Sequence, residues 1–332
     1  MSRTSRGIAS GLVAALVALG TAELVAAASS TLRSPVVDVG NRVVDLVPPS
    51  VKDLAIRWFG TDDKVALLVG MAVILALAAA ALGVLALRGH RRVGVAGVAA
   101  FGVVGAYAAL TGRDGRGVPA ALPSVVGAAA GAVALVVLAR VGSPAGGPTA
   151  DPSPAEASPG DAVASTRRAF LAATGALAVA GLAAGAAGWW LGERFSAAAS
   201  RAAVVLPRAR RPLPPVPASV RVGTPGVTPF ITPDPDFYRI DTALQVPQVQ
   251  VDDWRLRIGG MVDAPMELSF DQLLARELVE ADITLTCVSN EVGGGLLGTA
   301  RWLGVRLDDL LRDAGVHRHA DQVVGRSVDG YT

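Results

Sequence analysis

Long apolar runs dominate the first part of the chain, whereas alternating or mixed sequence dominates the remainder. Crossing about 30 Å of hydrocarbon at about 1.5 Å per residue takes roughly 20 mainly apolar residues. Segments of this kind lie at Gly7–Ala28, Val65–Leu87, Val93–Leu110, Ala120–Leu138 and Ala169–Leu191. The pattern therefore predicts an α-helical membrane bundle of about five spans.

The first apolar segment follows Arg3 and Arg6, as the core of a secretory signal peptide would. Its length, and the three apolar segments that follow closely, favour a retained helix. Glu23 is the one charged residue inside a predicted span. An acid there indicates either an ion relay or a position near the helix end, where the carboxylate reaches the headgroups. The second interpretation is favoured because no other charged residue lies in a span to complete a relay.

A change of pattern from Thr228 onward predicts a domain with both strands and helices. Alternation predicts strands at Trp254–Ile258, Ile283–Cys287 and Gln322–Ser327. Helices are predicted at Ser269–Ala275, with Ser269 as its cap, and at Val305–Ala314. Asp329-Gly330 is a hairpin turn signal. The class expected for this part is α+β.

Two Pro-rich stretches separate these parts and set the expected domain boundaries. The first is rich in Pro, Gly, Ala and Ser and lacks apolar periodicity, which is typical of a disordered linker. The second contains five prolines between Leu206 and Pro217, which predicts an extended spacer. The expected order is a four-span membrane region (1–141), a linker (142–168), a fifth membrane helix (169–191), a Pro/Arg-rich spacer (192–228) and an α+β domain (229–332).

Composition agrees with a chain partly dissolved in lipid. The 332 residues have a mean hydropathy of +0.47, and 17% are charged. A net charge of +2 with scattered arginines argues against a nucleic-acid partner, and a single cysteine excludes an internal disulfide. His90, His317 and His319 lie outside the predicted spans, so paired axial ligands for a haem in the bundle are absent.

Basic residues suggest an orientation for the spans. With five spans, most flanking arginines fall on one side, which the positive-inside rule makes cytoplasmic. Arginines after the fifth span, from Arg194 to Arg211, oppose this assignment. Ser165–Leu171 reads Ser-Thr-Arg-Arg-Ala-Phe-Leu, which resembles a twin-arginine export signal, although two ordinary juxtamembrane arginines would look similar. We therefore expect a multi-pass protein of the cytoplasmic membrane whose C-terminal domain is extracytoplasmic.

Cys287 is the residue on which the chemistry depends. A lone cysteine is most often a buried small hydrophobe. This one follows a predicted strand and precedes the glycine-rich loop Gly293–Gly295, which a bulky ligand can approach closely. A thiolate in such a place is a soft, electron-donating metal ligand.

Three stretches carry a resemblance to the sulfite oxidase superfamily. Thr284–Asn290 (Thr-Leu-Thr-Cys-Val-Ser-Asn) resembles the family's cysteine segment, Gly298–Leu311 resembles its tryptophan-glycine stretch, and Ile231–Arg239 resembles its pterin-contacting segment. The resemblance implies a sulfite-oxidase-type molybdopterin domain, a molybdenum–molybdopterin cofactor, and Cys287 as the protein's metal ligand. Because family domains continue further, the domain is expected to be incomplete at its C-terminus.

The resemblance also implies site residues. The catalytic pair would be Cys287 and Arg239. Cofactor contacts would come from Phe237, Tyr238, Arg239, Ile240, Asp241, Cys287, Ser289, Asn290 and Asp329. In sulfite oxidases the arginine of this stretch lies one position later, which puts sulfite specificity in doubt. Asn290 and Glu291 either orient the ligand or cap the loop, and His317 and His319 are expected in solvent.

The function expected is that of a membrane-anchored molybdopterin-dependent oxidoreductase. It would transfer an oxygen atom in a two-electron reaction on a small-molecule substrate, such as a sulfite-like anion or a sulfoxide, and pass electrons to a quinone or a cytochrome. An alternative is a non-catalytic membrane protein whose degenerate domain serves interaction. A transporter is disfavoured because the spans contain almost no polar groups.

Overall fold

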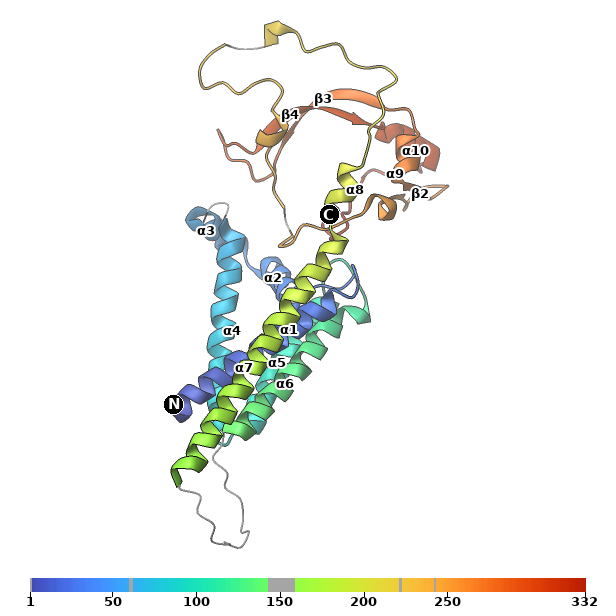
Figure 1. The fold of residues 1–332 in the computed structure, drawn as a ribbon. Coiled ribbons are helices and arrows are strands. Elements are labelled where there is room, and N and C mark those ends of the chain that lie inside the picture. Colours follow the sequence, from blue (N-terminus) through green and yellow to red (C-terminus); the bar gives the residue numbers. More distant parts are fainter. Residues whose placement is uncertain (1, 60–61, 143–158, 221–222, 242) are drawn as a thin grey trace. The chain divides into compact units, whose positions relative to one another are not determined.

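The computed structural model describes residues 2–59, 62–142, 159–220, 223–241 and 243–332 (Figure 1). They separate into two compact units. The helical unit holds Met1–Phe195 with two short later segments, 243–245 and 328–331. The sheet unit holds most of the chain from Ser196 onward. A helical part followed by a smaller part with sheets is the order that the sequence predicts.

The five apolar segments are helices, as predicted. Among the described residues, five helices are long and apolar enough to cross a bilayer, with mean hydropathies of 1.8 to 2.8 over their best windows. The helices of this unit are α1 (Arg3–Ala26), α2 (Pro35–Leu46), α3 (Pro49–Phe59), α4 (Asp63–Leu87), α5 (Arg91–Leu110), α6 (Leu122–Gly142) and α7 (Pro159–Gly192), with a short 3-10 turn, η2 (Val118–Ala121), before α6.

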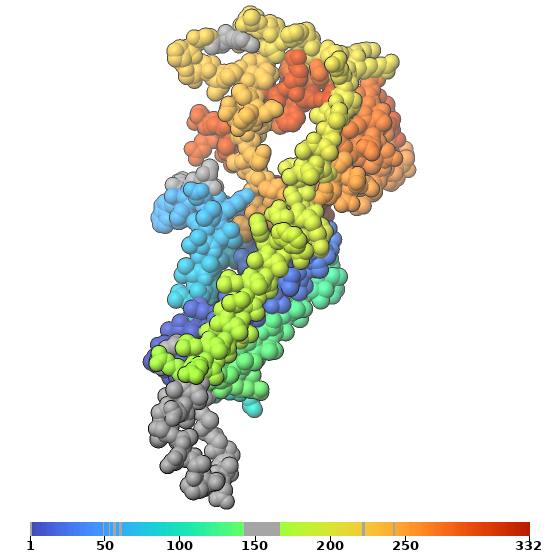
Figure 2. All heavy atoms as spheres, in the orientation of Figure 1, coloured from blue at the N-terminus to red at the C-terminus, as the bar shows by residue number. Residues whose placement is uncertain are grey.

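Glycines let α1 pack closely against α4, α6 and α7, its main neighbours (Figure 1). A Cβ atom on Gly11 would lie 1.8 Å from the Ala79 carbonyl oxygen of α4, and one on Gly20 would lie 2.0 Å from the Gly181 carbonyl oxygen of α7. A Cβ atom on Gly127 of α6 would lie 2.6 Å from the Ala18 carbonyl oxygen of α1. Figure 2 shows α7 covering part of α1 on the face in view. Small residues at helix contacts allow the helix backbones to approach each other closely, as is common in membrane bundles.

A buried ionic network joins α2 to the connection between α5 and α6. Arg116 pairs with Asp38 and, at 2.9 Å, with Asp114, which also accepts from Arg33 at 2.6 Å. The Asp38 side chain is 3% exposed and that of Arg116 is 9% exposed. Burial raises the pKa of the Asp38 carboxyl, while the charge of Arg116 opposes that rise. The partners lie far apart in sequence, so the network was not predicted.

Within its described residues, the sheet unit contains two antiparallel hairpins and three short α-helices. Its elements are β1 (Arg255–Ile258), β2 (Met266–Ser269), α9 (Phe270–Leu274), β3 (Val279–Thr286), β4 (Leu297–Gly304) and α10 (Leu307–Ala314), preceded by α8 (Ala198–Ala202) and short 3-10 turns. β1 pairs with β2, and β3 pairs with β4. Ser269 caps α9 as predicted, because its side chain accepts from the Gln272 N–H while the Gln272 side chain accepts from the Ser269 N–H.

The linker predicted for 142–168 is only partly testable. Residues 143–158 lie outside the described residues. From Pro159 onward the chain is helical, so 159–168 belong to α7 and the disordered linker was predicted too long. Proline is favoured in the first turn of a helix, and the alanines that follow have high helix propensity.

The Pro-rich spacer has backbone contacts that its sequence did not predict. The Arg210 N–H donates to the Leu278 carbonyl at 3.3 Å, and Arg211 forms a parallel bridge with Val279, so this part of the spacer lies along the start of β3. The strand predicted at Gln322–Ser327 is irregular. Alternating sequence becomes a strand only where a partner strand completes its hydrogen bonds.

Candidate functional site

Cys287 directly follows β3, at the closed end of the β3–β4 hairpin. β-Branched residues such as Ile283 and Thr284 favour the strand conformation. The hydroxyls of Thr284 and Thr299 lie 2.7 Å apart across the pair. The Cys287 N–H donates to the Leu296 carbonyl at 2.9 Å, which continues the ladder by one step. The backbone of the cysteine is therefore fixed by the sheet.

The loop 288–296 is organised by Asn290. Its N–H donates to the Cys287 carbonyl at 3.0 Å, and its Oδ1 accepts from the Leu296 N–H at 2.8 Å. A Cβ atom on Gly294 would lie 2.7 Å from that Oδ1. Asn290 therefore caps the loop, which is one of the two roles considered for it, while Glu291 is exposed.

The thiol of Cys287 has an environment that favours its charged form. Its Sγ lies 3.0 Å from the Ser289 hydroxyl. The Ser289 hydroxyl and then the Ser289 backbone N–H lower the pKa of the Cys287 thiol, because both donate to the thiolate. The residue is half-buried, so the sulfur is held and still accessible. This is the chemistry of a soft metal ligand or a nucleophile.

The upstream aromatic segment lies against the same hairpin. The Thr232 N–H donates to the Thr299 carbonyl at 2.8 Å, and the Thr299 N–H donates to the Thr232 hydroxyl at 3.1 Å. The Phe237 ring covers Gly298, where a Cβ atom would lie 2.8 Å from the ring. Because Gly298 pairs with Leu285, this contact is two residues along β3 from Cys287. The predicted pterin-contacting segment therefore packs on the hairpin that carries the cysteine at its closed end.

The aromatic residues of this segment have different roles. The Phe237 ring stacks on Tyr238 with a centroid distance of 5.4 Å and meets Trp302 edge-on at 6.0 Å. Phe237 is thus an anchor within the unit, and Tyr238 is half-buried beside it. Trp302 and Gly298 both lie in the stretch Gly298–Leu311, which the sequence resemblance had already singled out.

The residues after Tyr238 are less constrained. Arg239 is exposed and has no hydrogen bond or ion pair within the described part of the chain, so its guanidinium is available to an anion. Ile240 is 53% exposed, and Asp241 is half-buried. Within the described part of the chain, no hydrogen bond joins these three positions to the hairpin.

Asp329 lies in the segment 328–331, which groups with the helical unit. Its Oδ1 accepts from the Tyr331 N–H at 3.3 Å in a turn. His317 bonds to Asp263 at 3.0 Å and His319 accepts from Arg318 at 3.2 Å, each at the surface. Within the described ranges, no group of three or more His, Cys, Asp and Glu residues could hold a metal. A metal on Cys287 would need its other donor atoms from a cofactor.

The residues around Cys287 fit a bulky sulfur-donating cofactor. Val288 and Val292, both in the loop, are fully exposed. Cβ atoms built on Gly293 and Gly295 would meet nothing within 4 Å. The loop after the cysteine therefore leaves room for a bulky group to approach.

One pair missed by sequence reasoning fixes the hairpin register. Arg301 donates to both carboxylate oxygens of Asp282, at 2.8 and 2.9 Å, from directly opposite positions on β4 and β3. The pair lowers the pKa of Asp282 through the Arg301 hydrogen bond. The two opposite charges are visible in the sequence, but β4 was not predicted as a strand, so their pairing could not be deduced.

Comparisons with known proteins agree with this geometry. Residues 243–332 match the oxidoreductase molybdopterin binding domain. Over 104 residues the chain is 36% identical to the mitochondrial sulfite oxidase of Rattus norvegicus, covering 27% of this chain and 19% of that protein. It is 31% identical over 118 residues to the NADPH nitrate reductase of Emericella nidulans, covering 30% and 13%. An uncharacterized oxidoreductase of Bacillus subtilis, YuiH, is 35% identical over 79 residues, covering 24% and 38%.

The matched region is a limited part of each relative. The chain spans less than a fifth of the sulfite oxidase and of the nitrate reductase, and less than two fifths of the Bacillus protein. No solved structure matches the chain. Residues 243–332, which include Cys287 and its loop, are thus similar to the molybdopterin-binding domain of oxidoreductases such as sulfite oxidase and nitrate reductase, and a domain of this kind takes molybdenum–molybdopterin as its cofactor.

Proposed function

We propose that this protein is a membrane-anchored molybdopterin-dependent oxidoreductase that transfers an oxygen atom to or from a small substrate, a sulfite-like anion or a sulfoxide. The observation that carries the proposal is the Cys287 thiolate, which is held at a strand end beside an open loop within the matched domain. When bound, the cofactor supplies the two-electron chemistry.

The chain's own residues hold and tune the site. Cys287 is the protein ligand, and the Ser289 hydroxyl lowers the pKa of its thiol, which favours the thiolate. Asn290 holds the loop so that the thiolate keeps one direction. Phe237 fixes the aromatic segment on β4, which leaves Arg239 exposed after it. Arg239 attracts and orients an anionic substrate.

Replacing Cys287 with serine tests the ligand. The full chain, purified from a host that makes molybdopterin, is expected to contain about one molybdenum per chain. In Cys287→Ser, X-ray absorption at the molybdenum edge should show one sulfur neighbour fewer, because an alcohol oxygen is a poor substitute for a thiolate. Ser219→Ala, an exposed position on a 3-10 turn, is the control. An unchanged sulfur shell in Cys287→Ser would rule out the assignment.

The membrane anchor is proposed from the five long apolar helices and the arginines between them. Arg167 and Arg168 have exposed side chains on α7, where an export receptor can reach them. The proposed topology places the sheet unit outside the cytoplasm. Alkaline phosphatase fused after Pro215 should be active, and changing Arg167 and Arg168 to lysine should abolish that activity. If a reporter fused after Pro215 is active only when the reporter is one that works in the cytoplasm, the proposed topology is wrong.

A further inference from the structure

The short helix α3 carries large apolar side chains on an exposed face. Val51, Leu54 and Trp58 are spaced by three and four residues, which places them on one side of the helix. They are 50%, 42% and 73% exposed, respectively. Phe59, at the end of the helix, is 48% exposed. The apolar face of α3, defined by Val51, Leu54 and Trp58, is therefore not covered by the described part of the chain.

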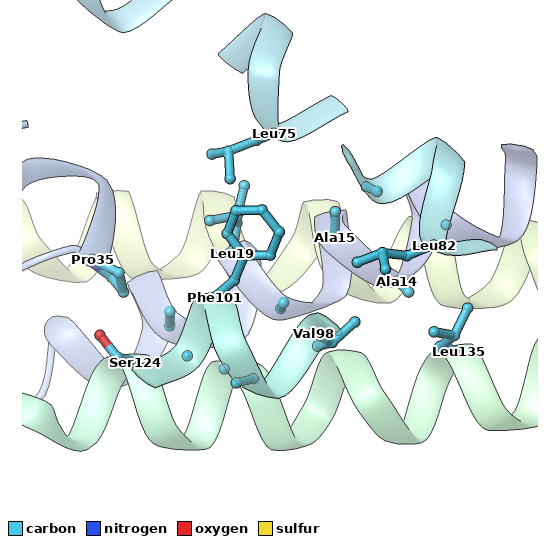
Figure 3. Close-up of a pocket in the computed structure, with 17 residues that line it drawn as sticks. Ala14, Ala15, Leu19, Pro35, Leu75, Leu82, Val98, Phe101, Ser124 and Leu135 are labelled. Atoms are coloured by element: carbon cyan, nitrogen blue, oxygen red, sulfur yellow. The ribbon is translucent and has the colours of Figure 1, made fainter. Parts of the chain in front are cut away.

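The next helix, α4, has an exposed apolar side that suits contact with lipid. Its Leu75 and Leu82 line an apolar pocket among α1, α4, α5 and α6 (Figure 3). Val69, Val73 and Leu77 are spaced four residues apart on the other side of α4, and they are 57%, 52% and 67% exposed. In the proposed membrane anchor, these three side chains face the acyl chains, because a span with an uncovered aliphatic side is stable only in an apolar solvent.

The covalent connection to α4 limits where α3 can lie. Phe59 is the last residue of α3 and Asp63 is the first of α4, so their Cα atoms are at most about 14 Å apart even in an extended chain. The two helices are also in contact, with α3 at one end of α4 (Figure 1). If α4 crosses the hydrocarbon, α3 lies near its surface, where the headgroup layer adds roughly 5–8 Å on each side.

The residue types of α3 match this depth. With 11 residues the helix is too short to cross the bilayer. Tryptophan is enriched at membrane–water interfaces, where its ring meets acyl chains and its N–H stays close to water. Lys52, half-buried beside the apolar face, can cover apolar surface with its stem while its ammonium reaches a phosphate. An apolar face next to charged residues is typical of a helix that lies in the interface.

We propose that α3 lies in the headgroup layer of a phospholipid bilayer, with its apolar face toward the acyl chains and Trp58 as its main anchor. In this position α3 fixes the depth of the first turn of α4. The proposal rests on the membrane anchor in the proposed function. It goes further, because α4 can cross a membrane whether or not α3 enters the interface.

Spin labels on single cysteines test the position of α3 in the full chain. The labels are attached to Val51→Cys or Leu54→Cys in a Cys287→Ser background, in phospholipid nanodiscs. Power-saturation electron paramagnetic resonance compares collisions with oxygen, which concentrates in lipid, and with a nickel chelate, which stays in water. Both labels should be protected from nickel relative to Ser219→Cys, an exposed position, and should lie at a shallower depth than Val73→Cys on α4.

Trp58→Ser tests the anchoring side chain. It should raise the nickel collision rate of the label at Val51 toward the value at Ser219. Trp189→Ser is the matched control, because it removes a tryptophan of similar exposure, 69%, from α7 and should leave the Val51 label at its depth. An unchanged Val51 label in Trp58→Ser would overturn the proposal. If that variant unfolds α3, the labels in the helix that keeps Trp58 still decide.

The remaining outcomes separate this proposal from the membrane anchor. Nickel collision rates at Val51 and Leu54 equal to that at Ser219 would overturn the proposal, because the face would then be in water. Labels that neither oxygen nor nickel reaches would also overturn it, because a second copy or another part of the chain would then cover the face. In both cases a nickel-protected label at Val73 shows that the membrane anchor stands. A Val73 label open to nickel contradicts the membrane anchor, and this proposal with it.

Discussion

The helical unit buries its apolar side chains more completely than the sheet unit does. The helical unit has a core of small and aliphatic residues, such as Ala14, Ala134 and Leu135, each at most 2% exposed. In the sheet unit, Ile283, Leu285 and Trp302 of the central hairpin are each more than 40% exposed. A helix satisfies its own backbone hydrogen bonds, so its side chains can pack closely on neighbours. A two-stranded sheet packs little by itself and depends on further layers or ligands to cover its faces.

The ion pairs of the two units also differ in how far they are buried. The network of Arg116, Asp38 and Asp114 in the helical unit has side chains at most 9% exposed. The pair Arg306–Asp308 in the sheet unit has side chains 60% and 49% exposed. Buried partners depend on each other because each leaves an uncompensated charge when the other is lost, whereas solvent screens the exposed pair.

Arg116→Ala should give the largest effect. It leaves Asp38 and Asp114 buried without their shared partner, which costs about 3–5 kcal/mol of unfolding free energy. Chemical denaturation of the detergent-solubilised chain, followed by circular dichroism, measures this cost. Arg306→Ala, at an exposed pair, should change stability little. Equal effects of the two substitutions would remove the contrast between the units.

Gly11→Ala tests the close contact of α1 with α4. Its Cβ would lie 1.8 Å from a backbone oxygen of α4, so the helices must separate, at a cost of about 1–3 kcal/mol. Thermal unfolding in detergent measures the loss. Gly70→Ala on α4 is the control, because nothing lies within 4 Å of its added atom. A tolerated Gly11→Ala would mean that the helices do not meet at this position.

Ser289→Ala tests the candidate site. Ser289 is exposed, so its removal should change the pKa of the Cys287 thiol with little effect on the free energy of unfolding. Ser289 lowers the pKa of Cys287, so the thiolate persists to lower pH than for an ordinary cysteine. Without the hydroxyl the pKa should rise, and the midpoint of the alkylation rate against pH should move upward. Iodoacetamide labelling of the full chain from a host without molybdopterin measures it. Ser219→Ala should keep the wild-type midpoint.

Local sequence patterns were sufficient for much of the fold. The apolar segments became helices because a span is specified by its own length and hydropathy. Ser269 capped α9 because its partner Gln272 lies three residues away. The strand predicted at Gln322–Ser327 was wrong, since a strand depends on a partner that its own sequence does not contain. The same limit hid the Arg116–Asp38 pair, whose members lie 78 positions apart.

For the candidate site, too, some features were predictable from the sequence and others only from the tertiary structure. The sequence by itself singled out Cys287, its glycine-rich loop and the aromatic segment, and the resemblance of these stretches to the sulfite oxidase superfamily predicted the metal-ligand role of Cys287. Only the tertiary structure decided that Phe237 packs on Gly298, that Asn290 caps the loop, and that Asp329 groups with the other unit. Contacts between distant segments depend on how strands and helices pack, and that packing is not encoded in any one segment.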